Sequence, residues 1–438
     1  MTAVALEGQN ALLIAVQTPD LAAAQIHESL EELTDLSASL GCTVVGRVVQ
    51  VRPRIDPGTF LGSGKLSHVS HDVKRLGVDV VIFDNNLSPS QGENLERSLG
   101  VMVMDRTQVI LEIFSQNAHT HEAGIQVGLA QLEYMLPRLV GMWAHLDRER
   151  GGIGGSKGTG EKQIDIDRSL IRSRITRLRK DLRHLSRERT TQKKRRTHCL
   201  LVSLVGYTNA GKSTLMNRLT NSDVQVEDRL FATLDSTTRV MVRDNRPAIL
   251  LSDTVGFLRN LPHELVASFR STLEVVRDAD LLLHVVDLSH DRFEEHIDTT
   301  ESVLDEIGAQ GVPRLMVFNK IDQVESKVAL LMARKRYPEA EFIAAVRDDP
   351  TEIKGNIAAF FEKRMVSAPL LLEYRDSADL AKIYRWGRVD AVRYEEDGIH
   401  LTVTSTPDNL DRIRAKVPAA RDERTARQGE GALSVEGP

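Results

Sequence analysis

Short apolar runs alternate with amphipathic stretches over residues 1 to about 117. We predict strands at 11–16, 42–51, 78–83 and 101–104, and helices at 21–40, 65–76 and 89–99. Strands that alternate with helices are typical of a mostly parallel sheet with helices on its faces. The pattern therefore predicts an N-terminal parallel α/β domain over residues 1–117. The polar cluster Asp84-Asn85-Asn86 follows a strand, where α/β sites often form, although a capping turn is the favoured interpretation.

Two apolar seams with helical spacing come next in the chain. Each seam repeats every three or four residues, with Leu129, Leu132, Leu136, Leu139, Trp143 and Leu146 in the first and Ile171, Ile175, Leu178, Leu182 and Leu185 in the second. Pro137 is expected to kink the first helix or to loosen one turn of it. We expect an antiparallel helical hairpin over residues 118–198, with a glycine-rich tip at 151–160.

The remaining pattern predicts two further domains. Buried strands at 200–205, 249–251, 281–286 and 315–318 indicate an α/β domain over residues 199–366. Residues 369–415 read as a small α/β module. Residues 416–438 are charged and lack periodicity, which is typical of a disordered tail. The expected fold class is a multidomain α/β protein.

Composition narrows the class of protein. The 438 residues are too many for one core and suggest about three domains. No run of 18 uncharged apolar residues exists, so we expect no membrane anchor. Cys42 and Cys199 make no metal-binding spacing, and the first ten residues do not resemble a signal peptide. We expect a cytoplasmic protein and a monomer.

The segment after the strand at 200–205 has the pattern of a phosphate-binding loop. It comprises Gly206, Tyr207, Thr208, Asn209, Ala210, Gly211, Lys212, Ser213 and Thr214, and a helix is expected to begin within it. Glycines let backbone N–H groups surround phosphate oxygens, and the helix N-terminus adds partial positive charge. Lys212 would bridge the β- and γ-phosphates, and the Ser213 hydroxyl would bind Mg²⁺.

Two later motifs have the order and spacing of switch regions. Thr233, preceded by Phe231, is expected to hold Mg²⁺ when a γ-phosphate is present. Asp253 would hold the same ion through a water, and Gly256 would donate its N–H to the γ-phosphate. We therefore expect Lys212, Thr233 and Gly256 to act in catalysis, and Phe231 to lie at the nucleotide.

The motif at residues 319–322 selects the base. Asp322 can accept hydrogen bonds from both N1–H and N2–H of guanine, a donor pair that adenine lacks. Asn319 would tether neighbouring loops and reach guanine N7, with Lys320 between them. Together with the phosphate loop, this motif predicts a GTPase that binds GTP and GDP with Mg²⁺.

Positive charge is concentrated in the hairpin. Residues 148–196 hold 17 Lys and Arg against six Asp and Glu, a net charge of +11, so the rest of the chain carries −16. Six of the ten residues at 151–160 are glycines. One interpretation is a connector with solvated basic faces. The other is a probe for structured RNA that uses Gly152, Gly154, Gly155, Lys157, Arg168, Arg172 and Arg174.

The chain resembles the HflX family of translational GTPases over nearly its whole length. The specific matches are Phe83-Asp84-Asn85-Asn86-Leu87-Ser88-Pro89-Ser90-Gln91, Asp105-Arg106-Thr107, Leu129-Ala130-Gln131-Leu132-Glu133-Tyr134, Leu136-Pro137-Arg138-Leu139, Gly160-Glu161, Asp167-Arg168, Phe231-Ala232-Thr233-Leu234-Asp235, Asp253-Thr254-Val255-Gly256-Phe257 and Leu261-Pro262. The resemblance implies a GTPase that binds the large ribosomal subunit and its RNA, and that helps to split stalled or idle ribosomes. It also implies that the hairpin tip reaches toward the peptidyl-transferase region. ATP hydrolysis has been proposed for the N-terminal domain of relatives, but this chain has no second phosphate loop.

Three features depart from the family pattern. The family commonly has a charged residue where Gly124 and Gly128 stand, and Asp235-Ser236 replaces the usual Asp-Pro of the first switch. The loop that contacts the guanine base reads Ala344-Ala345 instead of Ser-Ala, and the Ala345 N–H is expected to reach guanine O6.

Phe257 follows Gly256, where Ras-like GTPases carry the glutamine that orients the attacking water. We therefore expect slow intrinsic hydrolysis that a partner stimulates. The alternative function is a nucleotide-gated RNA-binding scaffold in which hydrolysis is incidental.

Overall fold

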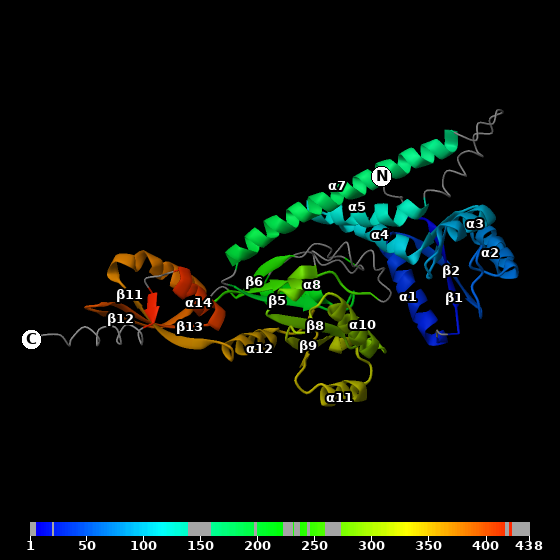
Figure 1. Cartoon of the computed structure of the whole chain (residues 1–438). Helices are drawn as coiled ribbons and strands as arrows, with labels where there is room; N and C mark the ends of the chain where they lie inside the picture. Colours follow the sequence, from blue (N-terminus) through cyan, green and yellow to red (C-terminus); the bar gives the residue numbers. More distant parts are fainter. Residues whose placement is uncertain are drawn as a thin grey trace, which may run out of the picture. The chain divides into compact units, whose positions relative to one another are not determined.

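The computed structural model describes residues 6–19, 22–138, 159–196, 199–221, 231, 237–242, 246–258, 273–416 and 420–422 (Figure 1). The chain divides into two compact units. The first consists of Met1–Arg187, Glu227–Asp235 and Leu258–Thr272, and the second of the remaining residues. Two short pieces of the nucleotide domain therefore belong to the first unit.

The first unit is built on a parallel sheet of order β2-β1-β3-β4. Its elements are β1 (Asn10–Gln17), α1 (Ala23–Ser39), β2 (Thr43–Val51), α2 (Ser63–Leu76), β3 (Val80–Phe83), α3 (Pro89–Leu99), β4 (Met102–Asp105) and α4 (Arg106–Asn117). Six consecutive residues of β1 are buried, as expected for a strand covered on both faces. The predicted parallel sheet is confirmed, whereas α4, whose apolar residues are buried on most sides, was not predicted as a helix.

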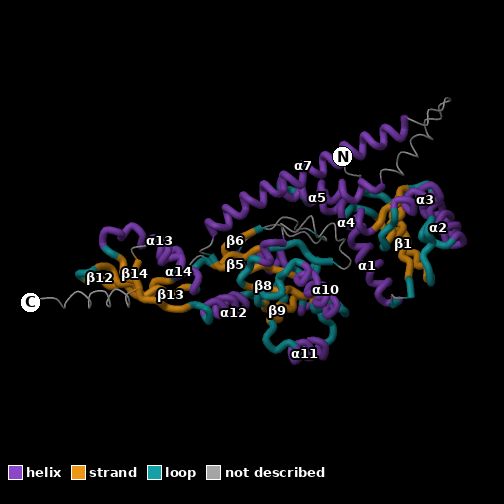
Figure 2. Tube along the Cα trace, in the orientation of Figure 1, coloured by secondary structure: helices purple, strands orange, loops and turns teal. Residues whose placement is uncertain are grey.

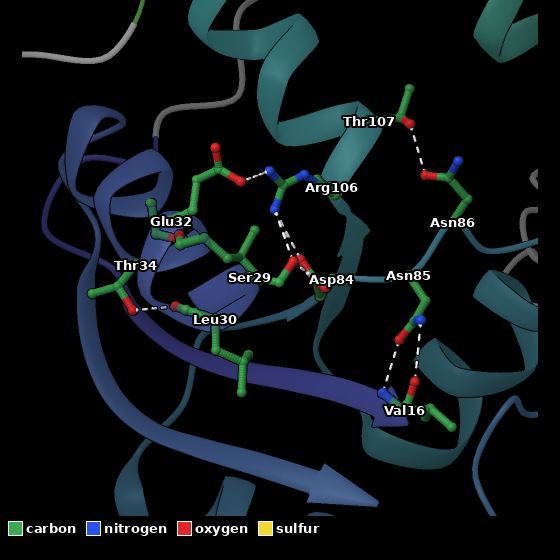
Figure 3. A network of polar contacts seen from close by, with 12 residues as sticks. Val16, Ser29, Leu30, Glu32, Thr34, Asp84, Asn85, Asn86, Arg106 and Thr107 are labelled. Carbon is green, nitrogen blue, oxygen red and sulfur yellow. Dashed lines mark hydrogen bonds and ion pairs between the residues drawn. The ribbon is translucent and has the colours of Figure 1, made fainter. Parts of the chain in front are cut away.

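A polar network ties the carboxyl ends of these strands to the helices (Figure 3). Asp84 accepts a hydrogen bond from Arg106 Nη1 at 2.9 Å, and Arg106, which is 3% exposed, also contacts Glu32. The Asn85 side chain pairs with the backbone of Val16, with Oδ1 accepting at 2.8 Å and Nδ2 donating at 3.3 Å. These contacts give the Asp84 cluster a structural role, but the expected capping turn is not seen, because the helix that follows is capped by Ser88.

The hairpin consists of α5 (His121–Met135), the 3₁₀ turn η1 (Leu136–Arg138) and α7 (Thr159–Arg196). The α-helix stops just before Pro137, which cannot continue the hydrogen-bond ladder. Helices α5 and α7 lie side by side (Figure 1). Leu129 and Leu132 of α5 pack against Ile175 of α7, with further contacts from residues of both predicted seams. The seam residues Leu139, Trp143 and Leu146 lie outside the described residues.

The second unit contains a six-stranded sheet of order β10-β9-β8-β5-β7-β6, in which only β6 is antiparallel. Its elements are β5 (Leu200–Val205), α8 (Lys212–Thr220), β6 (Thr238–Val242), β7 (Ile249–Ser252), β8 (Leu281–Asp287), α10 (Phe293–Glu306), β9 (Arg314–Asn319), η2 (Ile321–Gln323), α11 (Lys327–Arg336), β10 (Glu341–Phe342) and α12 (Thr351–Glu362). The four predicted strands form the buried centre of this sheet.

A four-stranded antiparallel sheet of order β12-β13-β11-β14 closes the described chain (Figure 2). Its elements are β11 (Val366–Leu372), η3 (Tyr374–Asp379), α13 (Leu380–Trp386), β12 (Arg388–Glu395), β13 (Gly398–Ser405), α14 (Pro407–Lys416) and β14 (Ala420–Asp422). Apolar residues at alternating positions of β11 and β13 pack against α13 and α14, so both helices cover one face. Strand β14 lies within residues 416–438, for which the sequence predicts no structure. Among the described residues, no helix combines the length and apolar composition of a membrane span.

Candidate nucleotide site

The predicted phosphate loop connects β5 to α8. The backbone at Gly211 has φ +87°, and a Cβ there would lie 2.1 Å from Asn319 Nδ2. Only glycine fits this left-handed turn without a clash. Because Gly211 is also the residue that precedes α8, it offers no side chain to cap the helix. An anion can therefore supply the partner for the N–H groups of the first turn.

Lys212 is the buried cation of the site, with 6% of its surface exposed. Its Nζ donates to the carbonyl oxygens of Tyr207, at 2.6 Å, and Gly206, at 3.1 Å. Burial lowers the pKa of Lys212 to about 8, and the carboxylate of Asp253 opposes part of that effect. The loop carbonyls thus hold an ammonium that lacks the solvation of water, and phosphate oxygens would provide it with counter-charge.

Nucleotide affinity is expected to fall as the pH rises above 8. Binding to phosphate favours the charged form of Lys212, so above its pKa of about 8 each binding event takes up a proton. The Kd for GDP should then rise by about tenfold per pH unit. Fluorescence titrations between pH 7 and pH 9.5 measure this slope. The Lys212→Met variant, which has no ammonium, should show a flat profile.

Ser213 and Asp253 bring two oxygen ligands together beside the phosphate loop. Ser213 Oγ donates to Asp253 Oδ2 at 2.6 Å, and Asp253 Oδ1 accepts from the Thr254 N–H at 3.0 Å. A hydroxyl and a carboxylate suit Mg²⁺, which prefers oxygen ligands and retains several waters. Ser213 would bind the ion directly and Asp253 through a water, and the ion would neutralise charge on the β- and γ-phosphates. Thr233 lies outside the described residues, and its role stays a prediction.

The chain after Asp253 approaches the phosphate loop closely. The N–H of Phe257 donates to Gly206 O at 3.1 Å, and the N–H of Thr208 donates to Phe257 O at 2.8 Å. A Cβ at Gly256 would lie 2.8 Å from Thr208 Cα and 3.0 Å from Lys212 Nζ. Glycine at position 256 therefore allows this close approach. The Phe257 side chain is 2% exposed, and an apolar ring cannot orient a water molecule.

Asn319 joins the phosphate loop to the base-binding loops. Its Nδ2 donates to Ala210 O at 2.9 Å, and its Oδ1 accepts from the Ala345 N–H at 2.9 Å. The predicted tether is therefore present, whereas contacts of Asn319 and Ala345 with guanine stay predictions. Lys320 has φ +58° and forms an ion pair with Asp287 at 2.8 Å. The Asp322 carboxylate lies exposed in η2, where it can accept from a base.

The sequence reasoning missed Asp348 as a support of the base-binding loop. Asp348 Oδ2 accepts from the Ala344 N–H at 2.8 Å, and Arg218 Nη2 donates to the Asp348 carbonyl at 2.7 Å. The hydrogen bond from Ala344 keeps the pKa of Asp348 below its usual value, with a further contribution from Arg347. An acidic residue four positions after Ala344 is a weak signal, because such residues are common in surface turns.

Phe231, expected at the nucleotide, is 3% exposed and belongs to the first compact unit. Its ring packs edge-on against Phe114 of α4 with 4.6 Å between centroids. Asn117 Nδ2 donates to its carbonyl at 2.9 Å. The residue just before the switch threonine motif is thus held by the N-terminal domain, and its contact with nucleotide stays a prediction.

The predicted RNA-contacting residues fall into two groups. Gly152, Gly154, Gly155 and Lys157 lie outside the described residues. Arg172 and Arg174 are exposed on α7, while Arg168 is half-buried. Arg168 precedes Ile175 by seven positions and lies close to the seam that faces α5, whereas Arg172 and Arg174 lie two residues apart on different sides of the helix. Positive charge is therefore spread around α7.

Three families of GTPase regions match successive parts of this chain. Residues 27–115 match the family described as GTP-binding GTPase N-terminal, residues 117–196 the GTP-binding GTPase middle region, and residues 201–320 the 50S ribosome-binding GTPase family. The GTPase HflX of Gluconacetobacter diazotrophicus is 39% identical, over 93% of this chain and 98% of its own. That of Magnetococcus marinus is 40% identical, over 93% and 95%. The chain belongs to the HflX family of GTPases.

The match to the 50S ribosome-binding GTPase family, over residues 201–320, includes the phosphate loop, the chain from Asp253 to Gly256, and Asn319. The GTPase HflX of Escherichia coli is 46% identical, over 68% of this chain and 70% of its own. The chain is therefore a GTPase that hydrolyses GTP, of a ribosome-binding family. P-loop GTPases typically use Mg²⁺, in agreement with the pairing of Ser213 and Asp253.

Proposed function

We propose that this chain binds the large ribosomal subunit and promotes the dissociation of stalled or idle ribosomes, with GTP hydrolysis stimulated by the ribosome. The observation that carries the proposal is the basic helix α7, which leads along the chain into the nucleotide domain. The residue after Gly256 in that domain is a buried phenylalanine, which cannot orient a water molecule. At about 1.5 Å per residue, the helix spans roughly 55 Å. Such a helix can extend far from the domain that anchors it.

The charge on α7 supports ribosomal RNA as its partner. Arg172, Arg174 and Arg177 are exposed, and Arg179, which pairs with Glu133, is more than half exposed. Exposed guanidinium groups bind phosphates and release condensed counterions, so affinity depends steeply on salt. The glycines at 151–160 would permit close approach of the backbone to crowded RNA. Structured RNA read by shape and charge fits this surface.

The burial of Phe257 supports stimulation by a partner. In Ras-like GTPases, the residue at this position orients the attacking water, whereas Phe257 is packed against the phosphate loop by two backbone hydrogen bonds. The site can bind GTP through Lys212 and Asp322, but it lacks a polar group at this position. A partner that orders the chain after Phe257 could position the missing group. Intrinsic hydrolysis is then slow.

Turnover of GTP with purified large subunits tests the proposal. We expect the wild type alone to hydrolyse far less than one GTP per second and large subunits to raise the rate by about a hundredfold or more. Shortening residues 151–160 should abolish most of this stimulation, because the tip could no longer reach its RNA site. The same variant should dissociate intact ribosomes more slowly, as measured by light scattering.

A pair of charge reversals provides the matched control. Arg172→Glu with Arg174→Glu on α7 should weaken binding to large subunits and flatten its salt dependence. Lys327→Glu with Lys335→Glu makes the same change in net charge on α11 and should leave binding intact. Several turnovers per second without ribosomes, or equal weakening by both pairs, would contradict the proposal.

A further inference from the structure

Three aromatic rings, those of Tyr207, His296 and His290, pack together beside the phosphate loop. The rings of Tyr207 and His296 are parallel within 4°, and their centroids lie 3.8 Å apart. His290 packs on the other imidazole at 4.3 Å with an angle of 40°. His290 Nδ1 also accepts from the Arg292 N–H at 3.2 Å, which fixes its ring in the loop before α10. The side chain of a phosphate-loop residue is therefore held from a neighbouring helix.

The position of His296 follows from the pattern of α10. Thr300, Val303 and Leu304 are the buried residues of this helix, and His296 precedes them by four, seven and eight positions. These spacings place His296 on the same face, one turn nearer the helix N-terminus. The packing of α10 onto its sheet thus delivers the imidazole to the phosphate loop.

Tyr207 stands at the junction of three parts of the site. Its carbonyl accepts from Lys212 Nζ at 2.6 Å, the shorter of the two bonds that hold this ammonium. Its backbone pairs with Phe257 in a short bridge between the phosphate loop and the chain after Gly256. The orientation of the Tyr207 peptide thus affects both the lysine that reaches the β- and γ-phosphates and the start of the second switch.

The loop before α10 also connects these three rings to the base-binding motif. Asp287, at the end of β8, accepts from the Ser289 N–H at 3.0 Å and pairs with Lys320 at 2.8 Å. His290 is the next residue after Ser289 in the chain. Lys320 is therefore linked through Asp287 and the Ser289–His290 segment to the imidazoles and on to Tyr207.

We propose that His296 is a positioning residue for GTP hydrolysis, which acts through its stack on Tyr207 to hold the Lys212 ammonium where charge develops on the γ-phosphate. Stacked aromatic pairs are worth about 1 kcal/mol beyond their buried area, which corresponds to about a fivefold change in rate. Lys212 addresses the β- and γ-phosphates, whereas Asp322 and Asn319 address the base. A small displacement of Lys212 matters most where charge develops in the transition state, so loss of the stack lowers kcat more than it weakens the binding of GDP.

Steady-state kinetics of the full chain without ribosomes test this role, so the outcome does not depend on ribosome binding. His296→Leu keeps the bulk of the side chain without a planar ring. We expect its kcat for GTP to fall about fivefold, with KM and the Kd for GDP changed less than about twofold. His296→Phe restores the stack and should recover most of kcat. Proton NMR should show the His296 ring signal shifted upfield in the wild type, and this shift should disappear in Tyr207→Leu.

The controls separate positioning from stability. His68→Ala removes an exposed imidazole on α2 and should leave kcat and KM unchanged. Thermal unfolding of both His296 variants shows whether the fold is retained. Unchanged kcat in His296→Leu would overturn the proposal. Equal loss of kcat in His296→Leu and His296→Phe, at an unchanged unfolding temperature, would also overturn it. A loss of kcat/KM that comes entirely from a rise in KM would overturn it as well.

Discussion

Replacing Asp322 by Asn lowers the affinity for GTP by about a hundredfold or more and favours xanthosine triphosphate instead. Asp322 can accept both N1–H and N2–H of guanine in charge-assisted hydrogen bonds. An asparagine amide would turn its own N–H groups toward the 2-amino group of guanine. Xanthine carries an oxygen at that position and can accept from the amide. Fluorescence titration with labelled nucleotides measures both affinities.

The matched control for this exchange is Asp298→Asn, which changes an exposed carboxylate on α10 of the same domain. It should bind GTP as the wild type does. If Asp322→Asn bound GTP as tightly as the wild type, the motif at residues 319–322 would not be the part of the site that recognises guanine. Equal losses for both substitutions would indicate a general effect of charge.

Replacing Lys212 by Ala lowers GTP hydrolysis by about a hundredfold or more, with or without ribosomes. The ammonium is the cation that would meet the β- and γ-phosphates, and the neighbouring carbonyls of Gly206 and Tyr207 carry no positive charge to replace it. Burial of this cation destabilises the nucleotide-free protein, as its lowered pKa of about 8 indicates. The variant should therefore unfold at no lower temperature than the wild type.

Hydrolysis assays and thermal unfolding check this second prediction together. If Lys212→Ala retained full turnover, the phosphate-loop assignment would be wrong. The same variant distinguishes the two functions that the sequence leaves open. A scaffold in which hydrolysis is incidental would keep its cellular role in this variant, whereas a GTPase that splits ribosomes would lose it.

Much of the fold could be predicted because its strands are short, buried and regularly spaced. The parallel N-terminal sheet and the hairpin seams through Leu129, Leu132 and Ile175 agree with the periodicity of apolar residues. Helix α4 was missed, since burial on most sides leaves no amphipathic pattern to recognise. The antiparallel C-terminal sheet was only partly foreseen, because pairing order is not encoded in local periodicity.

The sequence by itself determined the chemistry of the nucleotide site. A phosphate loop is formed by consecutive residues, so Gly206 to Ser213 specify it locally, and the motif at residues 319–322 likewise places Asn319 beside Asp322. Membership in the HflX family agrees with that prediction.

Only the tertiary structure decided which distant residues support this chemistry. The stack of His296 on Tyr207, the hydrogen bond from Arg218 to the Asp348 carbonyl and the docking of Phe231 on Phe114 join positions between 89 and 130 residues apart. Each depends on how helices and loops pack, and packing is a property of the whole fold that no single stretch of sequence contains.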